Sequence, residues 1–300
     1  MHEARHEFKG VVAAPITPFR ANGEINEDAY RRIIEFNIEA GIDGFWVAGG
    51  TGEMTLLDDD EVIRLAEITV DQAKGRAKSI IHVGAVTTRR AVRMAEGARK
   101  AGADAIACIP PYFFQPTDQA IVDHYRTVAG AADLPLFVYN LPMCTHVAMT
   151  PPLMENLIDG VPQLAGMKHS DFNMYYLNRF IDMDLAVYTG MMGFFLAALA
   201  LGCCGGIDGP PNVAPEPFVE AYDSYLKGDL ERAEKAQRRA SRITNLIWTT
   251  SFATAFHSAY KTWMTARLGI DCGKPRPPLP ELSGDQKKDF LRRMKELGGL

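Results

Sequence analysis

Short apolar runs alternate with longer segments in which apolar residues recur every three to four positions. Uninterrupted short runs are typical of buried parallel strands, and the longer period is typical of helices that cover a sheet. The predicted strands are Val11–Ile16, Gly44–Ala48, Ser79–Val83, Ala105–Ile109, Pro135–Tyr139, Leu164–Lys168, Leu185–Thr189 and Cys203–Ile207. The predicted helices are Glu27–Ala40, Asp59–Lys74, Arg89–Ala101, Asp118–Ala131, Pro151–Ile158, Phe172–Ile181, Gly193–Leu201 and Pro217–Leu226.

Strands that are separated by helices must run parallel, so the repeating unit is β-α. Gly41 and Gly102 each follow a helix and precede a strand, as expected of helix C-caps. A series of eight such units predicts an α/β protein with a closed (β/α)8 TIM barrel. An open doubly wound sheet is the alternative, but the turn after the first strand lacks the glycine-rich sequence typical of that fold.

The pattern changes after Leu226. Leu230–Ile247, Ala253–Leu268 and Gly284–Leu297 read as helices without intervening strands, and a proline-rich connector precedes the last. We therefore predict a catalytic barrel at residues 1–226 and a helical region at residues 227–300, packed on the barrel as a C-terminal appendage.

The charge and the cysteine content of the chain argue against several classes of function. The chain has 32 basic and 37 acidic residues, a formal net charge of −5, so it lacks the excess of positive charge expected of a nucleic-acid or anionic-membrane binder. Its 5 cysteines form no C-x-x-C pair, which argues against a zinc site or a disulfide framework. The N-terminal residues resemble no signal peptide, and glycines interrupt the uncharged stretch Ala186–Ile207. We expect a cytoplasmic protein without a membrane span.

Active sites of such barrels lie at the carboxyl ends of the strands. Five strand ends carry candidate residues: those of the second, fourth, fifth, sixth and eighth predicted strands. The second strand ends in Gly49-Gly50-Thr51-Gly52-Glu53. Successive amides in a glycine-rich turn can bind an anion, and Thr51 adds a hydroxyl. A plain tight turn explains the same five residues equally well.

Tyr139 ends the fifth strand, and Lys168 ends the sixth after Gly166-Met167. A tyrosine there can transfer protons, although a buried structural aromatic is the simpler reading. Burial lowers the pKa of a lysine, and a neutral amine attacks carbonyl groups. A structural lysine paired with a carboxylate is the alternative.

Taken together and in this order, GGTGE, YNLP and the strand-ending GMK resemble the dihydrodipicolinate synthase / N-acetylneuraminate lyase family. The resemblance runs from Phe8 through Asn212, with similar helix spacing beyond. It implies a class I mechanism without metal or cofactor, in which Lys168 forms a Schiff base with pyruvate or another 2-oxo acid. Many members are homo-oligomers, so it also implies a dimer or tetramer.

The resemblance assigns further roles. Tyr139 would move protons, and Thr51 would link its phenol to the substrate. The amides of Gly50 and Thr51 would hold the substrate carboxylate, and the backbone of Ile207 would be another contact. Asp208, which follows Ile207, is a candidate for orienting a substrate hydroxyl or acting as a base.

Four departures from the family pattern bear on the substrate. Gly50 stands where the synthases and lyases usually have Thr or Ser, as in the sugar-acid dehydratases of the family. Phe113 stands where many members offer a tyrosine to a neighbouring subunit. Cys144 replaces the arginine that binds the second substrate of dihydrodipicolinate synthases, and Met191 and Met192 stand where sialic-acid lyases have acidic residues. These last two argue against both named activities and predict an apolar distal pocket.

Three functions therefore stay open from the sequence. The first is a Schiff-base lyase that performs aldol cleavage or condensation, with a 2-keto-3-deoxy sugar-acid dehydratase as its variant. The second is a non-catalytic barrel that binds a 2-oxo acid. The third is a metal-dependent enzyme, for which His82 and His169 lack any paired ligand motif. His146 and His169 are also candidate polar groups of the distal pocket, although a structural role suits each as well.

Overall fold

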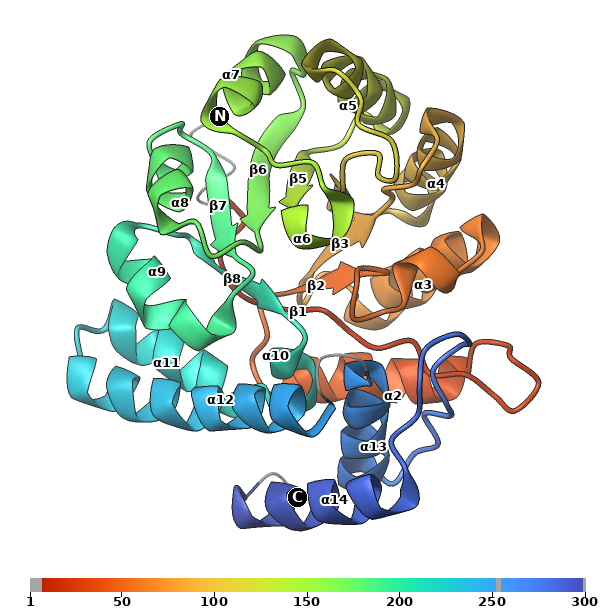
Figure 1. Cartoon of the computed structure of the whole chain (residues 1–300), viewed down its shortest axis with the longest axis vertical. Coiled ribbons are helices and arrows are strands. Elements are labelled where there is room, and N and C mark those ends of the chain that lie inside the picture. Colours follow the sequence, from red (N-terminus) through yellow and green to blue (C-terminus); the bar gives the residue numbers. More distant parts are fainter. Residues whose placement is uncertain (1–6, 252–254, 299–300) are drawn as a thin grey trace.

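The computed structural model describes residues 7–251 and 255–298 and contains a closed barrel of parallel strands. The strands are β1 (Gly10–Ala13), β2 (Gly44–Val47), β3 (Lys78–His82), β4 (Ala105–Cys108), β5 (Leu136–Asn140), β6 (Leu164–His169), β7 (Ala186–Thr189) and β8 (Gly205–Asp208). They follow one another in chain order around the barrel, and β1 closes it by pairing with β8 (Figure 1). The predicted TIM barrel is confirmed.

Helices lie outside the strands, as the alternating pattern predicted (Figure 1). They are α2 (Glu27–Glu39), α3 (Asp59–Ala73), α4 (Thr88–Ala101), α5 (Asp118–Ala132), α7 (Pro151–Gly160), α8 (Met174–Ile181), α9 (Phe195–Leu201) and α11 (Glu216–Leu226). Three short elements were not predicted: α6 (Pro142–Thr145), α10 (Pro210–Val213) and the 3-10 turn η1 (Met54–Leu56). A second 3-10 turn, η2 (Met192–Phe194), overlaps the start of the predicted helix Gly193–Leu201. Elements of three or four residues are too short to show a helical period.

Three further helices follow: α12 (Leu230–Ser251), α13 (Phe256–Leu268) and α14 (Gly284–Glu296). The last of these helices was predicted within one residue, whereas residues 253–254 of the predicted helix 253–268 lie outside the described residues. Trp263 and Phe290 from this region share one apolar cluster with Ile16, Ile33 and Val213 of the barrel region. The division at residue 226 stays a prediction. Within the two described ranges, no helix combines the length and apolar character needed to cross a membrane.

Large side chains fill the inside of the barrel. Trp46, Phe137 and Tyr188 are almost fully buried there, in a cluster that also contains Tyr139. Gly205 lets β8 approach β1, because a Cβ at this position would lie 1.9 Å from the Gly10 carbonyl oxygen. The packed interior leaves the carboxyl ends of the strands as the place where polar side chains can meet a ligand.

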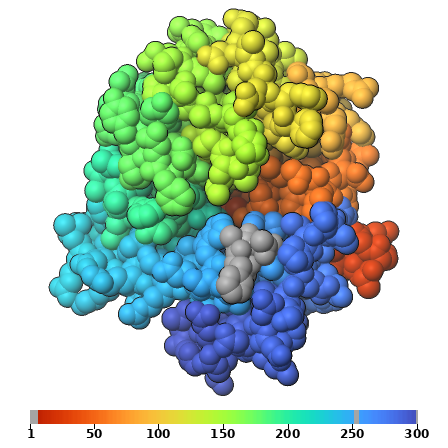
Figure 2. Space-filling model, viewed as in Figure 1, coloured from red at the N-terminus to blue at the C-terminus, as the bar shows by residue number. Residues whose placement is uncertain are grey.

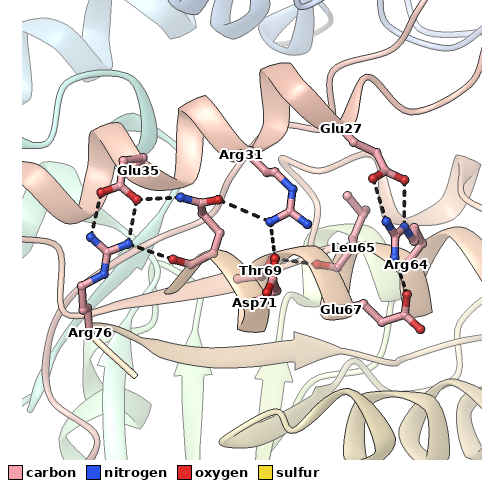
Figure 3. A network of polar contacts seen from close by, with 10 residues as sticks. Glu27, Arg31, Glu35, Arg64, Leu65, Glu67, Thr69, Asp71 and Arg76 are labelled. Atoms are coloured by element: carbon pink, nitrogen blue, oxygen red, sulfur yellow. Dashed lines mark hydrogen bonds and ion pairs between the residues drawn. The ribbon is translucent and has the colours of Figure 1, made fainter. Parts of the chain in front are cut away.

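Ion pairs join α2 and α3 on the outside of the barrel (Figure 3). Arg76 forms a bidentate pair with Glu35 through two hydrogen bonds of 2.7 Å. Arg64 forms a bidentate pair with Glu27 through hydrogen bonds of 2.7 and 2.8 Å. These guanidinium groups are almost half exposed, so each pair contributes little to stability. They link α2 with α3 and with the turn that follows α3, on the outside of the barrel.

Candidate active site

Lys168 and Tyr139 lie side by side at the carboxyl ends of neighbouring strands. The ladder between β5 and β6 pairs the two residues, and the Lys168 Nζ atom is 4.5 Å from the centre of the Tyr139 ring. The same amine is 5.3 Å from the Trp46 ring. Lys168 is only 5% exposed, and this burial lowers its pKa to about 8, against the opposing attraction of Asp208. A substantial fraction of the amine is therefore neutral near pH 8 and able to attack a carbonyl carbon.

The Tyr139 phenol is protonated at neutral pH. Burial raises its pKa, and the negative charge of Asp208 raises it further, while a hydrogen bond with Ser170 acts in the opposite direction. A Cβ on Gly50 would lie 3.8 Å from the Tyr139 hydroxyl, so the glycine at this position faces the phenol. Tyr139 can therefore donate a proton toward the space between Gly50 and Lys168.

Asp208 ends β8 and places a carboxylate near the amine. Its Oδ1 accepts a hydrogen bond from the Gly209 amide at 2.7 Å, and its Oδ2 accepts one from the Met192 amide at 3.4 Å. Burial raises the pKa of Asp208, whereas the charge of Lys168 and the two amides lower it. Ile207, the preceding residue, is fully buried and pairs with Val12 of β1. The carboxylate of Asp208 at the end of β8 therefore attracts the amine of Lys168 in β6.

The turn after β2 has the geometry of an anion-binding site. Ala48 and Glu53 both have positive φ, 53° and 66°, so the chain reverses sharply between them. The amides of Gly52 and Glu53 close the turn by donating to the carbonyls of Gly49 and Gly50. In the described part of the chain the amides of Gly50 and Thr51 have no protein acceptor, and Thr51 is partly exposed. Two amides are therefore free to bind a ligand carboxylate.

The distal side of the site is formed by the segments after β5 and β7. Cys144 lies exposed on α6, near enough to raise the pKa of the Tyr139 phenol, and Met143 beside it is 69% exposed. Met191 is partly exposed and precedes the amide that binds Asp208. The expected role of Met192 in this pocket is wrong: it is fully buried and packs against Gly206, where a Cβ would meet its sulfur. Figure 2 shows a depression between the segment after β5 and the C-terminal helices.

Two of the three candidate histidines, His82 and His169, have structural partners. His169 is bonded on both ring nitrogens, to the Asn140 side chain at 3.0 Å and to the Asn173 carbonyl at 3.2 Å. His82 accepts a hydrogen bond from the Ile109 amide at 3.3 Å, and burial together with the charge of Lys168 lowers its pKa to about 3. His146 is exposed. Across residues 7–251 and 255–298, no three His, Cys, Asp or Glu side chains gather in a group able to hold a metal ion.

Comparison with known proteins now adds to this geometry. The model of the dihydrodipicolinate synthetase family matches residues 7–297. The chain belongs to this family. It is 32% identical to a 4-hydroxy-tetrahydrodipicolinate synthase of Methanopyrus kandleri over 296 residues, which cover 97% of each chain. It is 30% identical over 277 residues to an N-acetylneuraminate lyase of Escherichia coli, covering 91% of this chain and 93% of the relative.

Solved structures of the family have the same fold. The crystal structure of dihydrodipicolinate synthase from Aquifex aeolicus aligns with a TM-score of 0.88 at 30% identity, covering 97% of this chain and 98% of the other. The N-acetylneuraminate lyase of Proteus mirabilis aligns with a TM-score of 0.89 at 27% identity, covering 98% and 99%. The two names stand at similar distances from this chain, so the comparisons do not exclude either activity.

Against this family background, the structure adds residues that the motifs did not indicate. Ser170 is buried on the same side of the strand end as Lys168 and hydrogen-bonds with Tyr139; the period of two along a strand was the available signal. His257 and Tyr260 reach the site from α13, and no sequence pattern connects that helix with a strand end. By contrast, Phe113 is 83% exposed, with its ring 5.0 Å from that of Phe114.

Proposed function

We propose that the protein is a Schiff-base lyase that acts on pyruvate or a related 2-oxo acid, with Lys168 as the nucleophile. The observation that carries this proposal is the buried amine of Lys168, whose pKa lies near 8 and whose neighbour across the ladder is Tyr139. Membership of the family supports the same assignment. An amine in this state attacks a ketone without metal assistance.

The surrounding groups suit each step of that chemistry. The neutral amine adds to the keto carbon, and the resulting hydroxyl leaves as water once Tyr139 has supplied a proton. The protonated imine then accepts the electron pair of the bond that breaks at C3. The free amides of Gly50 and Thr51 would bind the carboxylate of the 2-oxo acid, and Ile207 would contact it through its backbone.

The distal side of the site favours a substrate whose leaving part is not an anion. The exposed side chains there, Met143, Cys144 and Met191, carry no charge, and the nearby Asp208 would repel a second carboxylate. We therefore propose aldol cleavage or condensation with an uncharged aldehyde, which disfavours the reaction of dihydrodipicolinate synthase. Sialic-acid lyase is disfavoured for a different reason: the methionine side chains offer no strong hydrogen-bond partners to the hydroxyls of a sugar. Both of those reactions belong in the assay because close relatives bear these names.

A borohydride trap tests the Schiff base. The protein is incubated with pyruvate, reduced, and analysed by intact mass and peptide mapping. A stable adduct on Lys168 is expected, and K168M should form none, whereas K235M, which removes a lysine on the exposed side of α12, should react like the wild type. Modification of other lysines only, or equal labelling of K168M, would refute the assignment.

Further assays of the unmodified protein separate the alternative functions. Release of an aldehyde from 4-hydroxy-2-oxo acids identifies an aldolase, and loss of water without carbon–carbon cleavage identifies a dehydratase. Binding of pyruvate by calorimetry without any adduct, including with longer 2-oxo acids, would identify a non-catalytic barrel and contradict the proposal.

A further inference from the structure

Helix α13 places three residues from two adjacent turns against the active site. His257, Tyr260 and Lys261 have the spacing of one helical face, and all three are almost fully buried. His257 Nε2 donates a hydrogen bond to the Gly50 carbonyl at 2.9 Å. Lys261 Nζ is 2.7 Å from the carboxylate of Glu53. The C-terminal helical region therefore holds both ends of the turn that carries the free amides.

The third residue of this face, Tyr260, brings a second phenol to the strand ends. A Cβ on Gly209 would lie 2.5 Å from the Tyr260 hydroxyl and 2.9 Å from the Thr51 hydroxyl. Both hydroxyls therefore occupy the space beside Gly209. The backbone of Gly209, with φ −72° and ψ −43°, suits any residue, so this position needs glycine for the two hydroxyls and not for its own conformation.

Asp208 connects this phenol with the groups already described. It directly precedes Gly209, and its carboxylate is fixed by the amides of Gly209 and Met192. Its negative charge raises the pKa of Tyr260 as it raises that of Tyr139, and it attracts Lys168. One carboxylate thus lies within electrostatic reach of the amine and of two phenols.

We propose that Tyr260 is a positioning residue that orients Asp208 and Thr51, and that Asp208 is the base that takes and returns the substrate proton. The inference rests on the proposed function. In aldol cleavage Asp208 accepts the proton of the C4 hydroxyl, the C3–C4 electron pair moves to the imine to give an enamine, and the aldehyde leaves. The resulting carboxylic acid returns that proton to C3, which restores the imine. Asp208 thus ends the cycle in the same ionised state in which it began.

This arrangement accounts for the exposed Phe113. In many family members a tyrosine at that position serves the site of a neighbouring subunit, and here the ring lies on the surface. Tyr260 supplies a phenol from the same chain instead. Each chain would then hold a complete set of proton-transfer groups.

The exchange of the methyl protons of pyruvate with solvent deuterium can be monitored by NMR. This exchange measures proton transfer at C3 separately from imine formation. Y260F is expected to lose about 10- to 100-fold in exchange rate, a share of the usual effect of general acid–base catalysis. The yield of borohydride adduct should change by less than about twofold, because Lys168 and its surroundings are intact. Y30F is the matched control: Tyr30 is also buried and hydrogen-bonded, to Thr69 at 3.1 Å, but lies on α2 away from the site.

G209A provides a second variant that keeps every hydroxyl but crowds those of Tyr260 and Thr51, so it should lower exchange as Y260F does. Circular dichroism and urea unfolding establish that each variant is folded. Exchange by Y260F and G209A at the rate of Y30F would overturn the inference while leaving the Schiff base intact. A parallel loss of adduct and exchange in folded Y260F would also overturn it. Absence of both signals in the wild type would instead refute the proposed function.

Discussion

Lys261→Met is expected to destabilise the fold by about 3–5 kcal/mol, because it leaves a buried carboxylate without its counterion. The side chains of Lys261 and Glu53 are 2% and 0% exposed, and their charged atoms are 2.7 Å apart. After the substitution, the Arg276 amide at 2.8 Å is the hydrogen-bond donor that remains to Glu53. The Lys274 carbonyl also loses the ammonium group that donates to it at 2.9 Å.

Urea unfolding of the full chain measures this cost. With a slope of about 3 kcal/mol per molar urea, the expected loss moves the midpoint by about 1–1.7 M. Lys235→Met is the control, because Lys235 pairs with Glu231 on the surface with 69% and 80% of the two side chains exposed. That substitution should cost no more than about 0.5 kcal/mol.

The double variant E53Q/K261M decides whether the charge itself is the cause. Removing both charges should cost clearly less than the sum of the two single variants, with a coupling energy of about 1–3 kcal/mol. The reasoning is wrong if K261M stays within about 1 kcal/mol of the wild type, or if the two single effects simply add.

Two further outcomes follow from the site and the barrel. The rate of adduct formation should rise with pH through a midpoint near 8 and level above it, because the neutral form of Lys168 attacks. In D208N the midpoint should move to lower pH, since the carboxylate that favours the ammonium form is gone. A midpoint above about pH 10 would show that burial does not lower the pKa of Lys168, and it would contradict this reasoning. Gly205→Ala should cost about 1–3 kcal/mol in urea unfolding, because its Cβ would overlap the Gly10 carbonyl, whereas Gly193→Ala meets nothing within 4 Å and should be nearly neutral. Equal stability of the two variants would contradict this account.

Sequence periodicity predicted the barrel because each strand is a buried apolar run followed by an amphipathic helix. It placed the end of the first strand too late. The ladder of β1 ends at Ala13, although the Ala14 amide still donates to the Asp208 carbonyl at 2.9 Å. Pro15 has no amide hydrogen and cannot continue the pairing. Apolar character alone does not distinguish a residue in the ladder from a buried residue just beyond it.

The central site residues were predictable for a different reason. Lys168 and Tyr139 end adjacent strands, and a barrel brings such positions together whatever the loops do. Ser170, His257 and Tyr260 were not predicted. The last two depend on how a helix more than 40 residues beyond β8 packs against the barrel, and nothing local to α13 specifies that contact.

The apolar cluster shared by α2, α10 and the C-terminal helices has a consequence for the newborn chain. Ile33 is made well before Trp263 and Phe290, which belong to the same cluster. At about 5–20 residues per second, roughly 10–50 seconds separate the synthesis of these residues. Throughout that interval the growing polypeptide exposes an apolar surface that α13 and α14 cover later, so this surface is open to aggregation until both helices have been made.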